Sequence, residues 1–546
     1  MTHITRAPGR WGLIALLLLT TFGQIATVNA ATASAVAPDL PDPYPALSEV
    51  PSIEKTRCPF AKGDLPSDLS GPSDLVCGTI TVPEDHANPD GPTITLFLVK
   101  IPGSSKDAQT SPLFVLAGGP GQGASDAVGQ FSTEVQDPIA SWQPLAQGRD
   151  VILVDQRGTG HSEPSLLCPA DRATPGADNP GAESTPIPSG NESDNQSAVD
   201  VYGDCAQALT DEGIDLETYT TRQSAADLDL VRQALGARQI DLLGTSYGTW
   251  LALEMMRYYP DTVRSAILNS PVPPQSDLLA GQLIAFQDSL DAVYAGCKAD
   301  TRCNAAFPNL ERTLTRTVKE LNRNPRDVQY KDPTTNKKET APIDGQTFMS
   351  LVYQLVFIGP FIPFVPPLVS TVSQGNDELL SQLLPILAAS GEGISTGLYY
   401  AVMCQDEIPF SSMNEIERQA EDAGVTQDVI DEGVASSQST FDVCEAWDLP
   451  ASPAIENTPV TSDIPALIVT GRFDPITPAS YGRELLKTLP NGVMIESPIA
   501  GHDPASTSGA CGVDIMEQFL THPRVELDTS CLDDLSIDFS LSQSGG

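Results

Sequence analysis

The sequence predicts an α/β protein built on a mostly parallel β-sheet. Short, wholly apolar runs, typical of strands buried on both faces of such a sheet, alternate with segments of helical periodicity. One of these runs, Ile240–Leu243, leads directly into Gly244-Thr-Ser-Tyr-Gly248, and a helical pattern follows from Trp250. A strand, a tight turn bearing a serine and a helix in succession indicate a nucleophile held at the end of a strand.

The composition permits a large folded core. The chain has 546 residues, of which 40% are hydrophobic and 18% charged, values that exclude a wholly disordered polymer. Its 71 acidic residues outnumber the 30 basic ones and give a formal charge of −41. Because nucleic acids and anionic membranes bind basic surfaces, we expect no nucleic-acid partner and no stable association with a membrane. The composition does not indicate an oligomeric state.

Residues 1–30 have the features of a cleaved export signal. Arg6 and Arg10 precede the apolar run Trp11–Leu19, and Val28-Asn-Ala30 offers the small residues that a signal peptidase reads. The apolar run is too short to span a bilayer comfortably, which argues against an uncleaved anchor. The mature protein is therefore expected to be exported, to the periplasm or outside the cell.

The predicted sheet begins after an arm. Residues 31–75, rich in Pro, Ser and Asp, are predicted to be extended rather than packed. A hairpin over Gly78–Ile101, with its turn at Asn88–Gly91, then opens the sheet. Helices are predicted at Gln223–Leu235 and Trp250–Tyr259, and further strands at Leu113–Leu116, Val151–Val154, Ile240–Leu243, Val263–Leu268, Ala466–Val469 and Val493–Ile495.

Two segments interrupt this alternation. Pro164–Ala198 is crowded with Pro, Gly, Ser, Asp and Asn, which indicates a long loop. From about Pro274 to Asn457 the pattern is mostly helical, and we interpret it as a lid inserted between two strands. Residues 76–273 and 458–546 would then form the two parts of the core, and residues 274–457 the insertion. Its helices are expected at Leu278–Ala295, Leu310–Leu321, Phe348–Phe357 and Glu378–Leu387.

The ten cysteines agree with export, because disulfides persist in oxidising compartments. Sequence alone does not fix their connectivity. Neither C-x-x-C nor H-E-x-x-H occurs, so no metal site is predicted, and no cofactor is implied. Short loop closure favours pairing of sequential neighbours: Cys58 with Cys77, Cys168 with Cys205, Cys297 with Cys303, Cys404 with Cys444, and Cys511 with Cys531.

Ser246 is the predicted nucleophile. Its turn would lift the hydroxyl clear of the sheet, and glycines are needed on either side of it because side chains there would collide with neighbouring elements. This arrangement is the nucleophile elbow of the α/β-hydrolase fold, which we take as the fold of the chain. A serine hydroxyl needs a base, and in this fold the order along the chain is serine, acid, histidine.

His502 is the predicted general base, and Asp474 the acid that orients it. His502 follows the last predicted strand, and Asp474 follows Ala466–Val469 at the carboxyl end of the sheet, where active sites gather. Both positions agree with the expected order. The other mature histidines, which are assigned to the surface or to packing, are His86, His161 and His522.

Acyl transfer also needs backbone N–H donors for the oxyanion of its transition state. One is expected from Tyr247, directly after the nucleophile. Another is expected from the glycine-rich stretch Gly118–Gly123, where Gly119 is the candidate donor. The alternative for this stretch is an ordinary tight turn, since Gly-Pro runs are common in turns.

Several stretches, in one order from about Cys58 to Cys531, match the motifs of a known family. They are Val82-Pro-Glu-Asp85, Asn88–Gly91, Gly118–Gly121, Asp155–Ser162, Gly244–Thr249, Gly471–Pro478 and Gly501-His502. Together they resemble the tripeptidyl aminopeptidase and proline iminopeptidase group of secreted α/β-hydrolases. The sequence departs from that pattern at Ala117, where many iminopeptidases have histidine, and at Asp503, where glycine is frequent.

The resemblance implies an activity. Members of the group release amino acids or short peptides from peptide N-termini, and acidic residues of the lid hold the free ammonium. Ala401–Glu407 resembles that lid segment, which makes Asp406 and Glu407 candidate ammonium ligands. A carboxylate paired with the ammonium would measure its distance from Ser246. In a chain this acidic, a place on the surface is the alternative for both.

The predicted function is therefore that of a secreted serine exopeptidase acting on peptides with a free N-terminus. A serine esterase of small carboxylic esters is the alternative, because the same triad serves both reactions and the fold does not fix the substrate. A non-catalytic scaffold is disfavoured, since no expected part of the constellation is missing.

Overall fold

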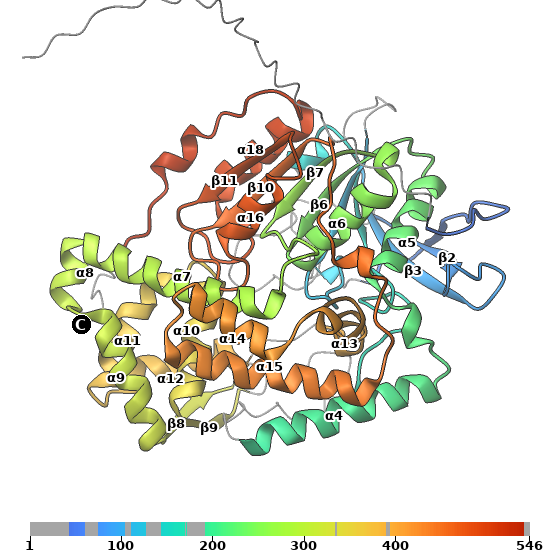
Figure 1. Ribbon diagram of the computed structural model, residues 1–546. Helices are drawn as coiled ribbons and strands as arrows, with labels where there is room; N and C mark the ends of the chain where they lie inside the picture. Colours follow the sequence, from blue (N-terminus) through green and yellow to red (C-terminus); the bar gives the residue numbers. More distant parts are fainter. Residues whose placement is uncertain are drawn as a thin grey trace, which may run out of the picture. The chain divides into compact units, whose positions relative to one another are not determined.

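The computed structural model describes residues 43–59, 75–103, 111–126, 144–169, 171, 192–332, 336–388 and 394–539 (Figure 1). The predicted signal peptide lies outside the described residues, as do residues 31–42 and 60–74 of the predicted arm. In the described part of the chain, no helix combines the length and the hydropathy needed to cross a bilayer.

A nine-stranded sheet, with strand order β1-β2-β3-β5-β4-β6-β7-β10-β11, organises the chain. The strand pairs from β5 to β11 are parallel, whereas β1, β2 and β3 and the junction of β3 with β5 are antiparallel. The prediction of a mostly parallel sheet is confirmed. The bounds are β1 (Glu54–Thr56), β2 (Val76–Pro83), β3 (Thr93–Ile101), β4 (Leu113–Leu116), β5 (Val151–Val154), β6 (Ile240–Thr245), β7 (Val263–Asn269), β10 (Ala466–Gly471) and β11 (Gly492–Ser497).

Helices cover both faces of this sheet. Leu242 and Leu243 of β6 are sequence neighbours that belong to separate apolar clusters, because successive side chains of a strand point to opposite faces. Every residue of β4, β5 and β10 is buried, as expected for strands of a parallel sheet covered on both sides. The first cluster includes residues of α5 (Thr221–Ala234), α6 (Tyr247–Tyr258) and α16 (Ala479–Leu485), and the second includes residues of α17 (Pro504–Thr507) and α18 (Gly509–Thr521).

Two predictions for connecting segments were wrong in part. Within the predicted arm, β1 pairs antiparallel with β2 at the edge of the sheet. Its side chains are exposed, so it left no apolar pattern in the sequence. The predicted loop Pro164–Ala198 ends early, because α4 (Glu192–Asp211) begins inside it. Packing against α15 (Gln427–Trp447) supports α4, with Trp447 Nε1 donating to the Tyr202 carbonyl at 2.8 Å.

The insertion leaves the sheet after β7 and returns at β10, and these two strands are parallel neighbours. It is mostly helical, but it also contains an antiparallel hairpin that the helical prediction omitted, β8 (Arg326–Lys331) with β9 (Lys338–Ile343). Besides α15, its helices are α7 (Leu278–Ala299), α8 (Thr301–Ala306), α9 (Leu310–Arg323), α10 (Gly345–Phe357), α11 (Val365–Ser373), α12 (Glu378–Ala388), α13 (Thr396–Val402), the π-helical turn η4 (Met403–Glu407) and α14 (Met413–Asp422).

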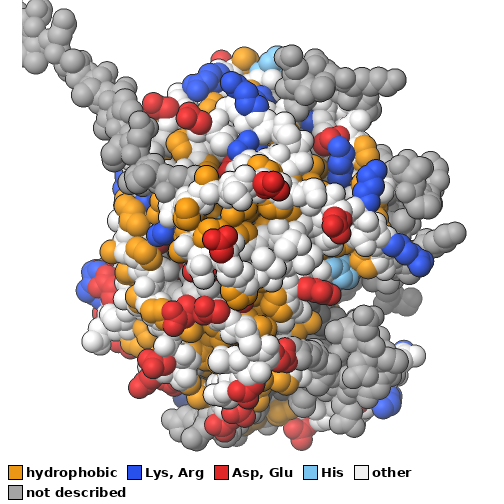
Figure 2. Space-filling view, turned by 90° about the vertical axis from the view of Figure 1, so that its right-hand side faces the viewer, with side chains coloured by type: hydrophobic (Ala, Val, Ile, Leu, Met, Phe, Trp, Pro, Cys, Tyr) orange, Lys and Arg blue, Asp and Glu red, His pale blue; other side chains and the backbone are white. Residues whose placement is uncertain are grey.

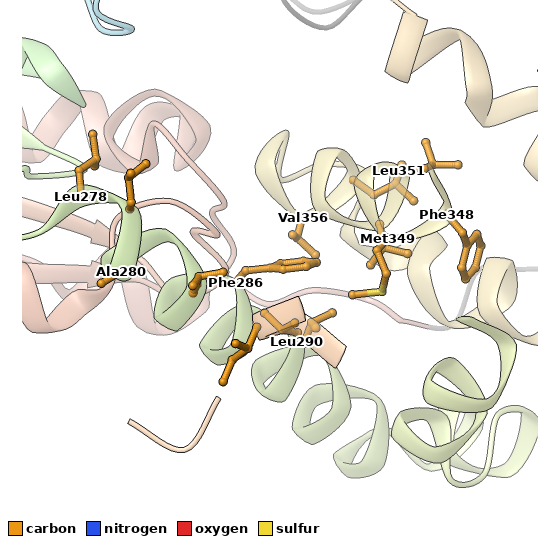
Figure 3. Close-up of a cluster of buried hydrophobic side chains, with 14 of the residues drawn as sticks. Leu278, Ala280, Phe286, Leu290, Phe348, Met349, Leu351 and Val356 are labelled. Carbon is orange, nitrogen blue, oxygen red and sulfur yellow. The ribbon is translucent and has the colours of Figure 1, made fainter. Parts of the chain in front are cut away.

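An apolar cluster of its own holds the insertion together. Phe286 and Leu290 of α7 and Leu351 of α10 belong to it (Figure 3). The same cluster includes Tyr247 and Trp250 of α6. The insertion therefore packs against the helix that starts directly after Ser246.

Five disulfides join the sequential neighbours that short loop closure favours. Cys58–Cys77 fastens the segment after β1 to β2, and Cys404–Cys444 joins η4 to α15. This number of disulfides fits a protein exported to an oxidising compartment.

The charged side chains are unevenly spread over the face drawn in Figure 2. Asp and Glu gather in its lower half, at the height where Figure 1 shows the insertion and α4. Lys and Arg lie mainly in its upper half. On this face the negative charge is thus concentrated on the helical part of the molecule.

Candidate active site

Ser246 lies in a strained turn between β6 and α6. Its φ of 57° and ψ of −125° lie outside the regions that non-glycine residues usually adopt. A Cβ on Gly244 would lie 2.2 Å from the Gly248 carbonyl oxygen, and a Cβ on Gly248 would lie 2.1 Å from the Leu116 carbonyl oxygen. The glycines are therefore needed because the backbone of β4 and the first turn of α6 approach this turn closely.

His502 and Asp474 form a buried pair. His502 Nδ1 lies 2.9 and 3.0 Å from the two carboxylate oxygens of Asp474. Burial favours a higher pKa for Asp474, but the charge of His502 and the hydrogen bonds to the carboxylate hold that pKa below its usual range. Burial likewise disfavours protonated His502, yet the Asp474 carboxylate outweighs it and raises the histidine pKa. With Nδ1 engaged in this way, Nε2 is the basic atom of the imidazole.

Two hydroxyls and the following turn hold the Asp474 carboxylate. Ser270 Oγ and Thr477 Oγ1 donate to Oδ2 at 2.7 and 2.6 Å. The N–H groups of Ile476 and Thr477 donate to Oδ1 at 2.9 and 3.1 Å. Sequence reasoning missed both hydroxyls. The sequence did hold a signal for Thr477, because an Asp followed by Pro-Ile-Thr is suited to such a side-chain turn, whereas Ser270 arrives from a distant strand.

Asn269, at the end of β7, joins the nucleophile turn to the histidine loop. Its carbonyl accepts from the N–H of Ser246 at 2.9 Å, and its Nδ2 donates to Asp503 Oδ1 at 2.5 Å. Its own Oδ1 accepts from the N–H of Ala505 at 3.0 Å. Ser246, Asp474 and His502 thus follow β6, β10 and β11, and all three lie at the carboxyl ends of these parallel strands. Among the described residues, no hydrogen bond joins the Ser246 hydroxyl to His502.

Asp503 adopts a left-handed conformation, with φ 61° and ψ 57°. Glycine favours this region, and Asp and Asn are among the other residues that tolerate it. The carboxylate also accepts from the N–H of Ser506 at 3.4 Å and so caps the short helix α17. The departure from glycine after His502 therefore leaves the geometry of the loop intact.

The glycine-rich stretch lies against the nucleophile. A Cβ on Gly118 would lie 3.1 Å from the Cβ of Ser246. Gly119 has a φ of 103°. On its far side the stretch is fastened to the insertion, because the Gly121 carbonyl accepts from the N–H of Ser395 at 2.8 Å. Of the two candidate oxyanion donors, Tyr247 directly follows Ser246, and Gly119 directly follows the glycine that approaches Ser246.

Asp406 and Glu407 are both buried in η4, but their surroundings differ. Asp406 Oδ2 accepts from the N–H and the hydroxyl of Thr221 at 2.8 and 2.6 Å. Its Oδ1 accepts from the Ser452 hydroxyl at 2.5 Å. Glu407 Oε1 accepts from the N–H of Leu278 at 2.7 Å, whereas its Oε2 has no hydrogen-bond partner among the described residues. Asp406 is therefore fully engaged within the fold, and Glu407 is not.

Burial raises the pKa of both carboxyls. That of Asp406 rises to about 6. That of Glu407 rises to about 8, with the nearby charges of Asp277 and Asp406 adding to burial. Burial raises the pKa of Tyr399 and of Tyr353, and the charges of Glu407 and Asp474, respectively, add to that effect.

His86, His161 and His522 lie outside this constellation. His86 is buried, and its Nε2 lies 2.7 Å from Asp227, which also accepts hydrogen bonds from Arg157 at 2.8 Å. His161 and His522 are exposed. In the described part of the chain, no group of three or more His, Cys, Asp or Glu side chains is arranged to hold a metal ion.

Comparison with known proteins supports the fold of this chain. Residues 111–345 match a family model described as the alpha/beta hydrolase fold, and residues 432–531 match one described as TAP-like protein. The chain has the α/β-hydrolase fold. The fold and the resemblance predicted from the sequence are both confirmed.

Three curated relatives of this chain carry different functional names. It is 32% identical to tripeptidyl aminopeptidase of Streptomyces lividans over 229 residues, which make up 41% of this chain and 40% of that one. It is 24% identical to serine protease Hip1 of Mycobacterium bovis over 446 residues, 78% of this chain and 81% of the other. It is 25% identical to carboxylesterase B of Mycobacterium tuberculosis over 443 residues, 76% and 78% of the two chains. The match to the first relative thus spans about two fifths of its length.

Proposed function

We propose that this α/β hydrolase is an exported serine exopeptidase that releases amino acids or short peptides from the N-terminus of a peptide. The observation that carries the proposal is the buried His502–Asp474 pair at the same edge of the sheet as the strained turn of Ser246. Geometry of this kind, rather than the fold, supports the assignment of a nucleophile, a base and an orienting acid.

The proposed reaction proceeds through an acyl-enzyme. Ser246 Oγ attacks the scissile carbonyl carbon while His502 Nε2 takes the hydroxyl proton. The resulting oxyanion accepts hydrogen bonds from the N–H groups of Tyr247 and Gly119. The C–N bond then breaks, and His502 returns its proton to the leaving amine. Water, activated by His502 in the same way, hydrolyses the ester and regenerates Ser246. Asp474 stabilises the imidazolium at each step.

Glu407 is the better candidate of the two proposed ammonium ligands. A buried carboxylate oxygen without a hydrogen-bond partner is unfavourable, and a substrate ammonium would satisfy it. Asp406 already accepts three hydrogen bonds, so in this proposal it fixes η4 rather than binding substrate. The insertion, residues 274–457, would then act as the lid that selects free N-termini. Export through a cleaved signal over residues 1–30 would deliver the enzyme to the periplasm or the medium.

A serine esterase remains the second candidate, since one of the relatives is named carboxylesterase B. The same triad would hydrolyse a small ester without any use for Glu407. The name tripeptidyl aminopeptidase on a 32% identical relative favours the peptidase.

One set of substrates separates the two functions. The purified enzyme would be given a short peptide anilide with a free N-terminus, its N-acetylated twin and a simple aryl ester, with Ser246→Ala as the blank. We expect the enzyme to cleave the peptide with a free N-terminus far faster than its acetylated twin, or to leave the acetylated twin uncleaved. Cleavage of the ester with neither peptide touched would replace the exopeptidase with the esterase, and full activity of Ser246→Ala would remove both.

A further inference from the structure

The C-terminal end of α10, in the insertion, lies directly against His502. The carbonyl of Phe357, the last residue of α10, accepts from the N–H of His502 at 2.9 Å. The Phe357 ring stacks on the imidazole, with 5.2 Å between ring centroids and 24° between ring planes. One residue of the insertion thus contacts the backbone and the ring of the candidate base.

We propose that Phe357 is a positioning residue for His502, so that the insertion fixes the orientation of the catalytic base besides covering the substrate. The proposal rests on the serine-hydrolase function proposed above. It does not depend on whether the substrate is a peptide or an ester, because His502 acts on Ser246 in both reactions.

The Phe357 ring is itself held in place by a row of aromatic side chains. Tyr353 and Phe357 are four residues apart on α10 and therefore share one face of the helix. Their rings are stacked, with centroids 6.5 Å apart. Tyr353 in turn makes an edge contact of 5.3 Å with Phe286 of α7, a buried member of the insertion's apolar cluster (Figure 3). The row runs from the core of the insertion to the face of the imidazole.

The contact also favours the protonated state that His502 must reach during the reaction. The last carbonyls of a helix carry the negative end of its dipole, and an aromatic face attracts a cation. The other groups that face His502 are the Asp474 carboxylate, across Nδ1, and the Asp503 carboxylate on its own loop. From α10 the nearest titratable group is Tyr353, which burial keeps neutral by raising its pKa. The Phe357 ring therefore contacts the face of the imidazolium, whereas Asp474 contacts its Nδ1 edge.

Close packing fixes α10 and the histidine loop relative to each other. A Cβ on Gly501 would lie 2.0 Å from the carbonyl oxygen of Val356 and 2.5 Å from that of Phe357. The loop can approach the helix end this closely because residue 501 has no side chain. Movement of α10 away from the core would therefore remove both contacts of Phe357 with His502.

The test compares Phe357→Leu with Phe357→Tyr in the full-length exported enzyme. Phe364→Leu is the matched control, because this ring lies in the same part of the insertion and pairs with Phe361 instead. We expect Phe357→Leu to lower kcat about tenfold on anilide and ester alike, with KM nearly unchanged, as an interaction realised in the transition state would. The acidic limb of its kcat/KM profile should move to lower pH. Phe357→Tyr, which keeps the ring, should have the kcat and the pH profile of the wild type.

A direct measurement of the histidine completes the test. With ¹⁵N-labelled histidine, the Phe357→Leu variant should show a lower pKa for the His502 ring than the wild type. Wild-type kcat and an unshifted pH profile in Phe357→Leu, or equal losses in Phe364→Leu, would overturn the proposal. A wild-type enzyme that cleaves only the ester would end the exopeptidase proposal while the Phe357 test proceeds on the ester. A wild type that neither cleaves these substrates nor reacts with a fluorophosphonate would overturn both.

Discussion

Thr221 donates both its N–H and its hydroxyl to one carboxylate oxygen of Asp406, at 2.8 and 2.6 Å, and so ties the first turn of α5 to the insertion. The same hydroxyl lies 3.0 Å from the hydroxyl of Tyr247, the residue after Ser246. Asp406 therefore connects the turn η4 with the helix that starts at the nucleophile. We expect this connection to hold the insertion in register with the core.

Asp406→Asn should test that role through stability. The amide keeps the shape of the carboxylate but turns one acceptor into a donor, which then faces groups that also donate. Leaving buried donors unsatisfied lowers the free energy of unfolding by about 1–3 kcal/mol each. We expect a lower Tm and similar losses on free and acetylated peptides. An unchanged Tm with a loss confined to free N-termini would assign Asp406 to the substrate instead.

Glu407→Gln should raise the stability of the fold and lower the affinity for peptides with a free N-terminus. Burial raises the pKa of this carboxyl from 4.5 to about 8, so the folded chain holds the proton more tightly than the unfolded chain does. Its contribution to folding is therefore present below about pH 4.5 and is lost as the pH rises to about 8. Gln does not titrate, so the Tm of the variant should exceed that of the wild type at pH 9 by more than at pH 5.

Glu407→Gln should also change KM. Glu407→Gln should raise KM for the peptide anilide with a free N-terminus and leave the acetylated peptide and the ester unaffected. Asp406→Asn serves as the neighbouring control, since its loss should be shared by every substrate. Equal KM values for wild type and Glu407→Gln on the free peptide would remove the ammonium role.

Asp474→Asn should lower kcat by about 10³- to 10⁴-fold, because the amide no longer stabilises the imidazolium or its tautomer. In the wild type, the raised pKa of His502 keeps the base protonated at low pH, so kcat/KM should rise as the pH passes that value. The acidic limb of this profile should move to lower pH in the variant. Thermal unfolding would show whether the variant remains folded. A folded Asp474→Asn enzyme with wild-type kcat would disprove the assignment of the acid.

The parts of the site that could be predicted are those encoded within a few consecutive residues. Ser246 is marked by its glycines, and Asp474 and His502 by their place after apolar strands. Asn269 and Ser270 could not be predicted, because only the adjacency of β7 to β6 and β10 brings them to the site. The sequence also gives no reason to distinguish Asp406 from Glu407. The groups that donate hydrogen bonds to them belong to α5 and α7, which are distant in the sequence.

The fold shows the same division. The boundaries of β4 and β5 follow directly from apolar runs that end at turn residues. By contrast, β1 is exposed and is stabilised by backbone hydrogen bonding to β2. The hairpin of β8 and β9 buries only alternate residues of short strands, a pattern too brief to override the helical periodicity around it. Elements stabilised by contacts with distant segments leave little trace in the local sequence.

Removal of the disulfide between Cys404 and Cys444 should weaken both the fold and the substrate selection. Cys404 lies in η4 two residues before Asp406, and the bond fastens this turn to α15 across a sequence separation of 40. Closing a loop of that length stabilises the folded chain by about 4 kcal/mol on the chain-entropy account. The double variant Cys404→Ala/Cys444→Ala should therefore have a lower Tm, and its preference for free over acetylated peptide should fall because Glu407 is no longer held in place.

Cys297→Ala/Cys303→Ala is the matched control for this prediction. Its disulfide also lies in the insertion but spans a separation of 6, so the expected loss of stability is smaller, about 2 kcal/mol. It is far from η4 in sequence and should leave the preference for free N-termini unchanged. Thermal unfolding and the ratio of kcat/KM for the free and acetylated peptides measure the two effects separately. Equal changes in that ratio for both double variants would mean that the selection of N-termini depends on the stability of the insertion as a whole and not on the position of η4.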